Sequence, residues 1–154
     1  MRTALGLIAL GLATICPIDA NDTLKGLKAV SVVVETLNEP VKQLGFTEEE
    51  LKQDVELKLR QNSLKVSSEN RVPFLYLNVN CMRVERIDAF VYNVQLSVVQ
   101  NALVISNGEH AAVDTWESSY LGIISANLVR NAVRESVKDR LDRFLNAYLK
   151  ANPR

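Results

Sequence analysis

The sequence predicts an α+β two-layer sandwich, with a mostly antiparallel sheet of about five strands and two helices in the order β-α-β-β-β-β-α. Three observations carry this prediction. Apolar residues recur at every second position in several short segments, and at helical spacing in two longer ones. The later strand segments follow one another without a helix between them, as in an antiparallel meander. Each helical segment has a single apolar stripe, so both fit most simply on one face of the sheet.

The limits of these elements follow from turn residues and helix caps. Asn38, Glu39 and Pro40 end the first strand, because a central strand does not continue through proline. Thr47 and Glu50 form a capping box at the start of the first helix, which Asn62 is suited to end. The expected strands are 28–37, 64–66, 74–81, 89–99 with a continuation through a bulge near Gln100 to 103–105, and 111–120; the expected helices are 47–62 and 128–149.

Alternation along the third and fourth strands predicts which side chains face the core. Asn107-Gly108 predicts a type I′ hairpin turn after residue 105, because both residues tolerate a positive φ. The stripe along the final helix packs on the same core. The expected core residues are Leu75, Leu77, Val79 and Cys81, then Phe90, Tyr92, Val94, Leu96 and Val98, and in the final helix Val129, Val133, Val137, Leu141, Phe144, Leu145 and Tyr148.

Residues 1–20 have the layout of a cleavable secretory signal peptide. Arg2 precedes an apolar run over 4–15, Pro17 breaks it, and Ala20 offers the small side chain that signal peptidase requires. The run is too short for a membrane-spanning helix, which takes roughly twenty apolar residues. We expect a mature chain of one domain, 21–154, without a transmembrane segment, located in the periplasm or secreted.

Cys16 leaves a second interpretation of this segment open. Bacterial lipoproteins are cut and acylated at a cysteine that ends an apolar signal. Bulky Ile15, however, occupies the position before the cysteine, where a small residue is needed. Cleavage after Ala20 is therefore the favoured interpretation.

Composition narrows the classes of partner. Lysine and arginine together number 18, as do aspartate and glutamate, and removal of residues 1–20 takes one of each sign. The mature chain is near neutral and has no overall attraction to nucleic acid. It keeps only Cys81, so no intramolecular disulfide can form, and its stability must come from a packed core.

Candidate catalytic and metal sites are few, and none is convincing. His110 is the sole histidine, and Asp114, four residues along the same strand, lies about 13 Å away if the strand is regular. Cys81 cannot form a thiolate metal site alone. Glu48, Glu49 and Glu50 are suited to the first turn of a helix, where acids complement the helix dipole. We expect no catalytic, metal or cofactor site, and no enzyme.

Two groups of residues are candidates for contact with a partner. The final helix carries six basic residues against three acidic ones, and Arg130 and Arg134 offer an anionic partner a site on its exposed face. Trp116 and Tyr120, with Tyr92, can form an exposed aromatic platform. The competing interpretations are a solvated helix face for the first group and core packing for the second.

The pattern as a whole resembles a family of uncharacterised exported bacterial proteins. The resemblance covers nearly all of the mature chain: the valine-rich first strand, the helix Leu51–Arg60, the strands Leu64–Val66 and Phe74–Val79, Thr115-Trp116, and the closing segment Phe144–Pro153. The order of elements is also similar to small periplasmic modules such as the amino-terminal domain of the translocation protein TolB. These modules bind other proteins, so the resemblance implies partners in the cell envelope and no catalytic residues.

The sequence therefore favours a non-catalytic periplasmic module that binds an envelope protein or assists envelope assembly, through a sheet edge or the final helix. The alternative is a carrier of a small apolar molecule, with a pocket between sheet and helices lined by Phe90, Tyr92 or Trp116. An enzyme is the third hypothesis.

The position of cleavage is directly testable. The intact mass of the exported protein should correspond to a chain that begins at Asn21, because the apolar run ends before Ala20. A diacylglyceryl mass on Cys16 would show that the chain is a lipoprotein instead.

Overall fold

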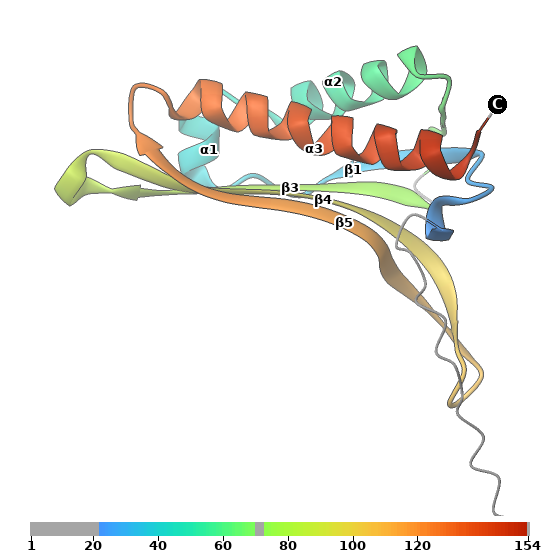
Figure 1. Cartoon of the computed structure of the whole chain (residues 1–154). Coiled ribbons are helices and arrows are strands. Elements are labelled where there is room, and N and C mark those ends of the chain that lie inside the picture. The colour runs from blue at the N-terminus through green and yellow to red at the C-terminus, as the bar shows by residue number, and fades with distance from the viewer. Residues whose placement is uncertain (1–21, 70–72, 154) are drawn as a thin grey trace, which may run out of the picture.

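A computed structural model describes residues 22–69 and 73–153; the expected signal peptide, 1–20, and Cys16 lie outside this range. Figure 1 shows two layers, a curved sheet with the helices on one face. The predicted α+β class, five strands and two long helices in the order β-α-β-β-β-β-α are confirmed, with a short helix α1 before α2. The elements are η1 (Asp22–Leu24), β1 (Ala29–Val34), α1 (Glu39–Gln43), α2 (Glu48–Gln61), β2 (Lys65–Val66), β3 (Phe74–Val84), η2 (Glu85–Ile87), β4 (Ala89–Val104), β5 (Glu109–Ser125) and α3 (Val129–Ala151).

The sheet is mixed, with the strand order β2-β1-β3-β4-β5. The meander of β3, β4 and β5 is antiparallel, as predicted, whereas β1 runs parallel to both β2 and β3. The parallel pairs arise because the chain leaves β1, crosses the sheet through α1 and α2, and re-enters in the same direction. The strand order leaves β2 and β5 as the two edges.

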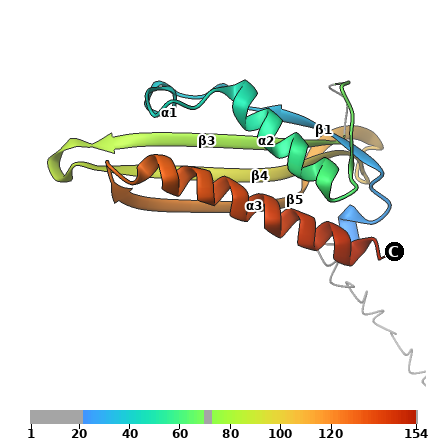
Figure 2. The same ribbon diagram turned by 90° about the horizontal axis from the view of Figure 1, so that it is seen from above.

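The helices divide the covered face between them. In Figure 2, α2 lies over the β1 side of the sheet and α3 over β4 and β5, and the contacts of the two helices agree. The predicted core residues of β3, β4 and α3 are buried, except Tyr148, which is partly buried and packs against the core. The opposite face of the sheet, which no helix covers, is called the open face below.

Helix caps explain where α1 and α2 begin. The side chain of Asn38 accepts from the Val41 N–H, 3.4 Å away, and Thr47 Oγ1 accepts from the Glu50 N–H, 3.1 Å away. The second half of the expected capping box does not form in the described structure, because the Glu50 carboxylate accepts from Arg134 Nη2 of α3, 3.2 Å away. The carboxylate that would cap its own helix ties α2 to α3.

The hairpin of β4 and β5 differs in three respects from the predicted one. β5 is longer at both ends, beginning at Glu109 and continuing five residues past the expected end at Tyr120, whereas β4 ends at Val104, close to the expected 105. The register shift lies at Val98/Val99, opposite Thr115, rather than near Gln100. The turn is a four-residue loop, 105–108, in which only Gly108 has a positive φ, and the Gly108 N–H donates to the Val104 carbonyl, 2.8 Å away. The type I′ prediction was wrong, because the loop closes as a wider turn that needs a single left-handed residue.

One helix of the described ranges, α3, is long enough to span a bilayer, but neither it nor any other described helix is apolar enough to do so.

Phe144 should be a principal source of stability. Its side chain is completely buried, and its ring contacts that of Trp116 edge-on, 5.5 Å between centroids. Phe144→Ala should lower the free energy of unfolding by about 3–5 kcal/mol, because it removes a large buried side chain and leaves a cavity. Urea denaturation checks this. Leu149→Ala, on the same helix but 37% exposed, is the control and should cost much less; equal losses would mean that α3 is not docked as described.

Cys81 should be an unreactive core thiol. Burial raises its pKa from the ordinary value of 9.0 to about 11. The folded state therefore holds a proton that the unfolded state releases between these two values, so stability should fall as the pH rises from 9.0 to about 11. Cys81→Ala should flatten this part of the pH dependence. Rapid native-state alkylation of Cys81 at pH 8 would contradict the burial.

Candidate interaction site at the edge of β5

The two arginines predicted as partner contacts are exposed, but both have contacts within the chain. The Arg130 guanidinium lies over the Phe46 ring, 5.9 Å from its centroid, and Arg134 pairs with Glu50. Both therefore lie on the flank of α3 that faces α1 and α2. Their role in binding an anionic partner stays a prediction.

The aromatic pair separates into one core residue and one surface residue. Trp116 is 8% exposed and packs on Phe144, so it belongs to the core rather than to an exposed platform. Tyr120 is 44% exposed and lies on β5, on the outer flank of α3, against Tyr92 and Arg140. The four predicted contact residues therefore do not form one surface.

Residues considered for chemistry are also apart. His110 is exposed near the hairpin loop, opposite Leu103 of β4, and β5 is regular between His110 and Asp114. Glu48 accepts from the Leu37 N–H, 3.0 Å away. Hydrogen bonds from backbone N–H groups, with a contribution from Lys42, lower the pKa of Glu48. Over residues 22–69 and 73–153, no group of three or more histidine, cysteine, aspartate or glutamate side chains could hold a metal ion.

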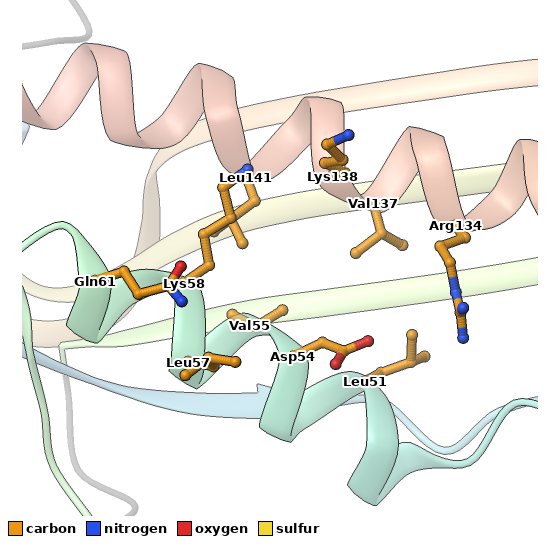
Figure 3. A pocket seen from close by; sticks show the side chains of 10 residues that line it. All are labelled: Leu51, Asp54, Val55, Leu57, Lys58, Gln61, Arg134, Val137, Lys138 and Leu141. Carbon is orange, nitrogen blue, oxygen red and sulfur yellow. The ribbon is translucent and has the colours of Figure 1, made fainter.

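A hollow of about 250 Å³ lies between α2 and α3, and Figure 3 shows the side chains that line it. Its floor is apolar, formed by Leu51, Val55, Val137 and Leu141, and charged side chains surround it. Ion pairs join the two helices beside it, Arg134 to Glu50 and Lys58 to Asp142. Sites for drug-sized ligands usually measure about 300–1,000 Å³, so this open hollow is small for a carrier. The carrier hypothesis expected a pocket lined by Phe90, Tyr92 or Trp116. All three side chains are instead buried in the core.

Two parts of the sheet's edges, β2 and the first half of β5, are protected against pairing with another strand. The β2 edge has only two residues, and one of them is Lys65. The first half of β5 carries Glu109, Asp114 and Glu117, contains the register shift, and is covered at Thr115, whose carbonyl accepts from Thr23 Oγ1, 2.8 Å away. Short length, charge and bulges are the usual means of preventing edge-to-edge pairing.

The second half of β5 lacks these protections. Residues 118–125 contain no charged side chain and no proline. Two contacts bound the segment: Arg140 Nη1 donates to the Ser119 carbonyl, 2.8 Å away, and the Leu128 N–H donates to the Ser125 carbonyl, 3.0 Å away. The stretch Tyr120–Ile124, called the open edge below, lies between these contacts. It pairs with β4 on one side, and no described strand pairs with it on the other.

The ladder pattern shows which backbone groups of the open edge point outward. The Ala126 N–H donates to the Asp88 carbonyl, 3.0 Å away, and hydrogen-bonded and non-hydrogen-bonded pairs alternate along an antiparallel ladder. Leu121 and Ile123, opposite Asn93 and Val91, therefore belong to non-hydrogen-bonded pairs. Their N–H and C=O groups point away from β4 and are available to a further strand.

Exposed apolar side chains accompany these backbone groups on the open face. Leu121 is 70% exposed and Ile123 is 60% exposed. Ile123 continues a cross-strand row with Val91 and with Met82, which is 61% exposed. The open edge thus combines unpaired backbone groups with an apolar patch, the combination that a strand-adding partner needs.

Arg140, from α3, lies at one end of the open edge. It is 6% exposed, its guanidinium lies over the Tyr120 ring, 5.6 Å from the centroid, and its Nε is buried without a hydrogen-bond partner among the described residues. No described carboxylate pairs with it. Burial raises the pKa of the nearby Tyr92, so its hydroxyl is uncharged at neutral pH and supplies no counter-ion to Arg140. The end of the open edge therefore has a buried positive charge without a counter-ion.

Gly122 makes this arrangement of rings possible. A Cβ atom at Gly122 would lie 2.7 Å from the Tyr120 ring and 3.0 Å from the Tyr92 ring. The two rings lie over the bare backbone of the glycine, which places Tyr120 beside Arg140.

Arg140, Leu121 and Ile123 were not predicted from the sequence to contact a partner. Arg140 was counted among the charged residues of the final helix, although Ser136 and Arg140 widen the stripe of Val133, Val137 and Leu141 and could have indicated burial. The strand was ended at Tyr120, but the uncharged run over 118–125 was a usable signal for a longer strand.

No protein-family model matches the chain, and no curated protein matches it. The resemblance to a family of exported bacterial proteins therefore stays a prediction. Among solved structures, a minor lipoprotein from Acinetobacter baumannii aligns with 79% of this chain and 90% of its own, at 9% sequence identity and a TM-score of 0.45. A likeness this distant indicates neither a partner nor a site.

Proposed function

We propose that the protein is a non-catalytic binding module of the cell envelope, which takes up an extended segment of a partner protein along the open edge of β5. The added segment would form backbone hydrogen bonds with Leu121 and Ile123 and cover their side chains. Location in the periplasm, or outside the cell, rests on the signal-peptide pattern of residues 1–20.

The observation that carries the proposal is the contrast along the sheet edges. β2 has only two residues, and the first half of β5 carries charges and a register shift. The second half of β5 is uncharged, and its exposed apolar residues Leu121 and Ile123 lie on an unpaired edge. An unprotected apolar edge is an aggregation risk in a free protein, so its presence here favours a role in binding a partner.

The absence of catalysis is part of the proposal and is supported by the placement of the reactive groups. His110 is exposed, and Cys81 is buried with a raised pKa. His110→Ala should therefore leave binding unchanged, because the histidine lies on the other half of β5, beyond the register shift. If this substitution abolished function in a folded protein, the enzyme hypothesis would replace the binding hypothesis.

Site-specific photocrosslinking in intact cells tests the binding proposal. A benzoylphenylalanine at position 123 should give a discrete adduct with an envelope protein, because Ile123 lies at the centre of the proposed interface. The same group at Leu57, which is 55% exposed on α2, is the control and should give none.

A charge on the edge should remove the adduct. With the photoreactive group at position 123, Leu121→Lys should reduce crosslinking at least about tenfold, because a lysine on an edge strand opposes the addition of another strand. The substitution should change stability by no more than about 0.5 kcal/mol, since Leu121 is exposed. Undiminished crosslinking in a folded Leu121→Lys protein would refute the edge-binding function.

A further inference from the structure

We infer that the open edge recognises the free C-terminus of its partner: a short apolar segment adds antiparallel to β5, and its terminal carboxylate pairs with the Arg140 guanidinium. This inference rests on the proposed function and names the chemistry of the partner.

The open edge is short. Only Leu121 and Ile123 lie between the two bounding contacts with both backbone groups turned outward. Adjacent outward-facing residues of a strand are about 7 Å apart, so the open edge holds an added strand of about three to five residues. Such a length suits the end of a chain better than a long internal strand.

Arg140 lies at one end of this edge. Its Nη1 donates to the Ser119 carbonyl, which belongs to the same outward-facing series as Leu121 and Ile123. The guanidinium therefore lies beside the sheet edge, where the backbone of an added strand would otherwise continue. An internal segment would have to displace the guanidinium, whereas a chain that ends at Leu121 meets it end-on.

Arg140 has a buried Nε without a partner, and no described carboxylate forms an ion pair with it. A positive charge of this kind favours an incoming anion, and guanidinium–carboxylate pairs are among the stronger hydrogen-bonded pairs in proteins. The positive charge also sets the direction of the strand. In the antiparallel orientation the C-terminal carboxylate reaches Arg140, whereas in the parallel orientation a positively charged N-terminus would lie there.

The side chains around the open edge define the rest of the preference. On the open face the added strand would meet Leu121 and Ile123, and on the helix face the half-exposed Tyr120. These surfaces favour β-branched or other apolar residues at the last positions of the partner. No charged residue of β5 lies between Ser118 and Ser125, so the terminal carboxylate is the single charge that the site selects.

The experiment uses synthetic peptides and the purified mature protein. An array of hexapeptides with free C-termini, their last four positions drawn from Val, Ile, Leu, Thr, Tyr and Ser, supplies a binding sequence. The best binder is then made in three labelled forms, as the free acid, as the C-terminal amide and with Gly-Ser appended. Fluorescence anisotropy should show the free acid binding at least about tenfold more tightly than the other two, the range expected for a charged hydrogen-bonded pair.

Variants assign this preference to Arg140. Arg140→Met keeps much of the apolar stem and should reduce the affinity of the free acid to that of the amide, while the affinity of the amide stays unchanged. Arg140 is buried, so a variant can fail to fold. The wild-type protein therefore supplies an independent reading, in which the Arg140 Nε–H resonance should shift when the free acid is added and not when the amide is added.

The outcomes separate this inference from the proposed function. Equal binding of all three peptide forms, abolished by Leu121→Lys, would overturn carboxylate recognition and leave edge binding intact. Binding that survives Leu121→Lys, or no binding by any peptide of the array, would overturn both. A wild-type dimer in sedimentation that Leu121→Lys dissociates would place a second copy of the chain on the edge and also overturn the inference.

Discussion

A β-sheet that does not close into a barrel has two edges, and each edge presents backbone groups that are left without partners. The rest of this structure depends on which parts of these edges are protected against pairing with another strand. A two-residue β2 ends the sheet on one side, and charges, a register shift and the Thr23 contact protect the first half of β5. Tyr120–Ile124 has neither a charge nor a partner strand on its outer side, and the proposed binding function rests on this segment.

The packing of the helices determines which residues lie at the same edge. Phe144 and its neighbours hold α3 against β4 and β5, and Glu50 holds the other flank of α3 through Arg134. A helix fixed at this place brings Arg140 to the Ser119 carbonyl and leaves its guanidinium buried over the Tyr120 ring. The packing of the core therefore determines both where the open edge stops and which charge lies at its end.

The sequence predicted the elements whose pattern is local. Alternation identified the buried faces of β3 and β4, and Thr47 identified the start of α2. Features that depend on distant contacts were not predictable from pattern alone. The parallel direction of β1 depends on the path of α1 and α2, and the Glu50 carboxylate pairs with Arg134 of a distant helix. The burial of Arg140 depends on how α3 packs on Ser119 and Tyr120 of β5. The candidate site lies where these non-local contacts meet.

Amide hydrogen exchange in the isolated protein, followed by NMR, tests most directly whether the edge is open. The N–H groups of Tyr120, Gly122 and Ile124 face β4 and should exchange slowly. Those of Leu121 and Ile123 point away from β4 and should exchange fast, because no described strand lies on that side of β5. Exchange should therefore alternate between slow and fast along these five consecutive residues. Slow exchange of Leu121 and Ile123 in the isolated, monomeric protein would contradict it, since their backbone groups would then already have partners.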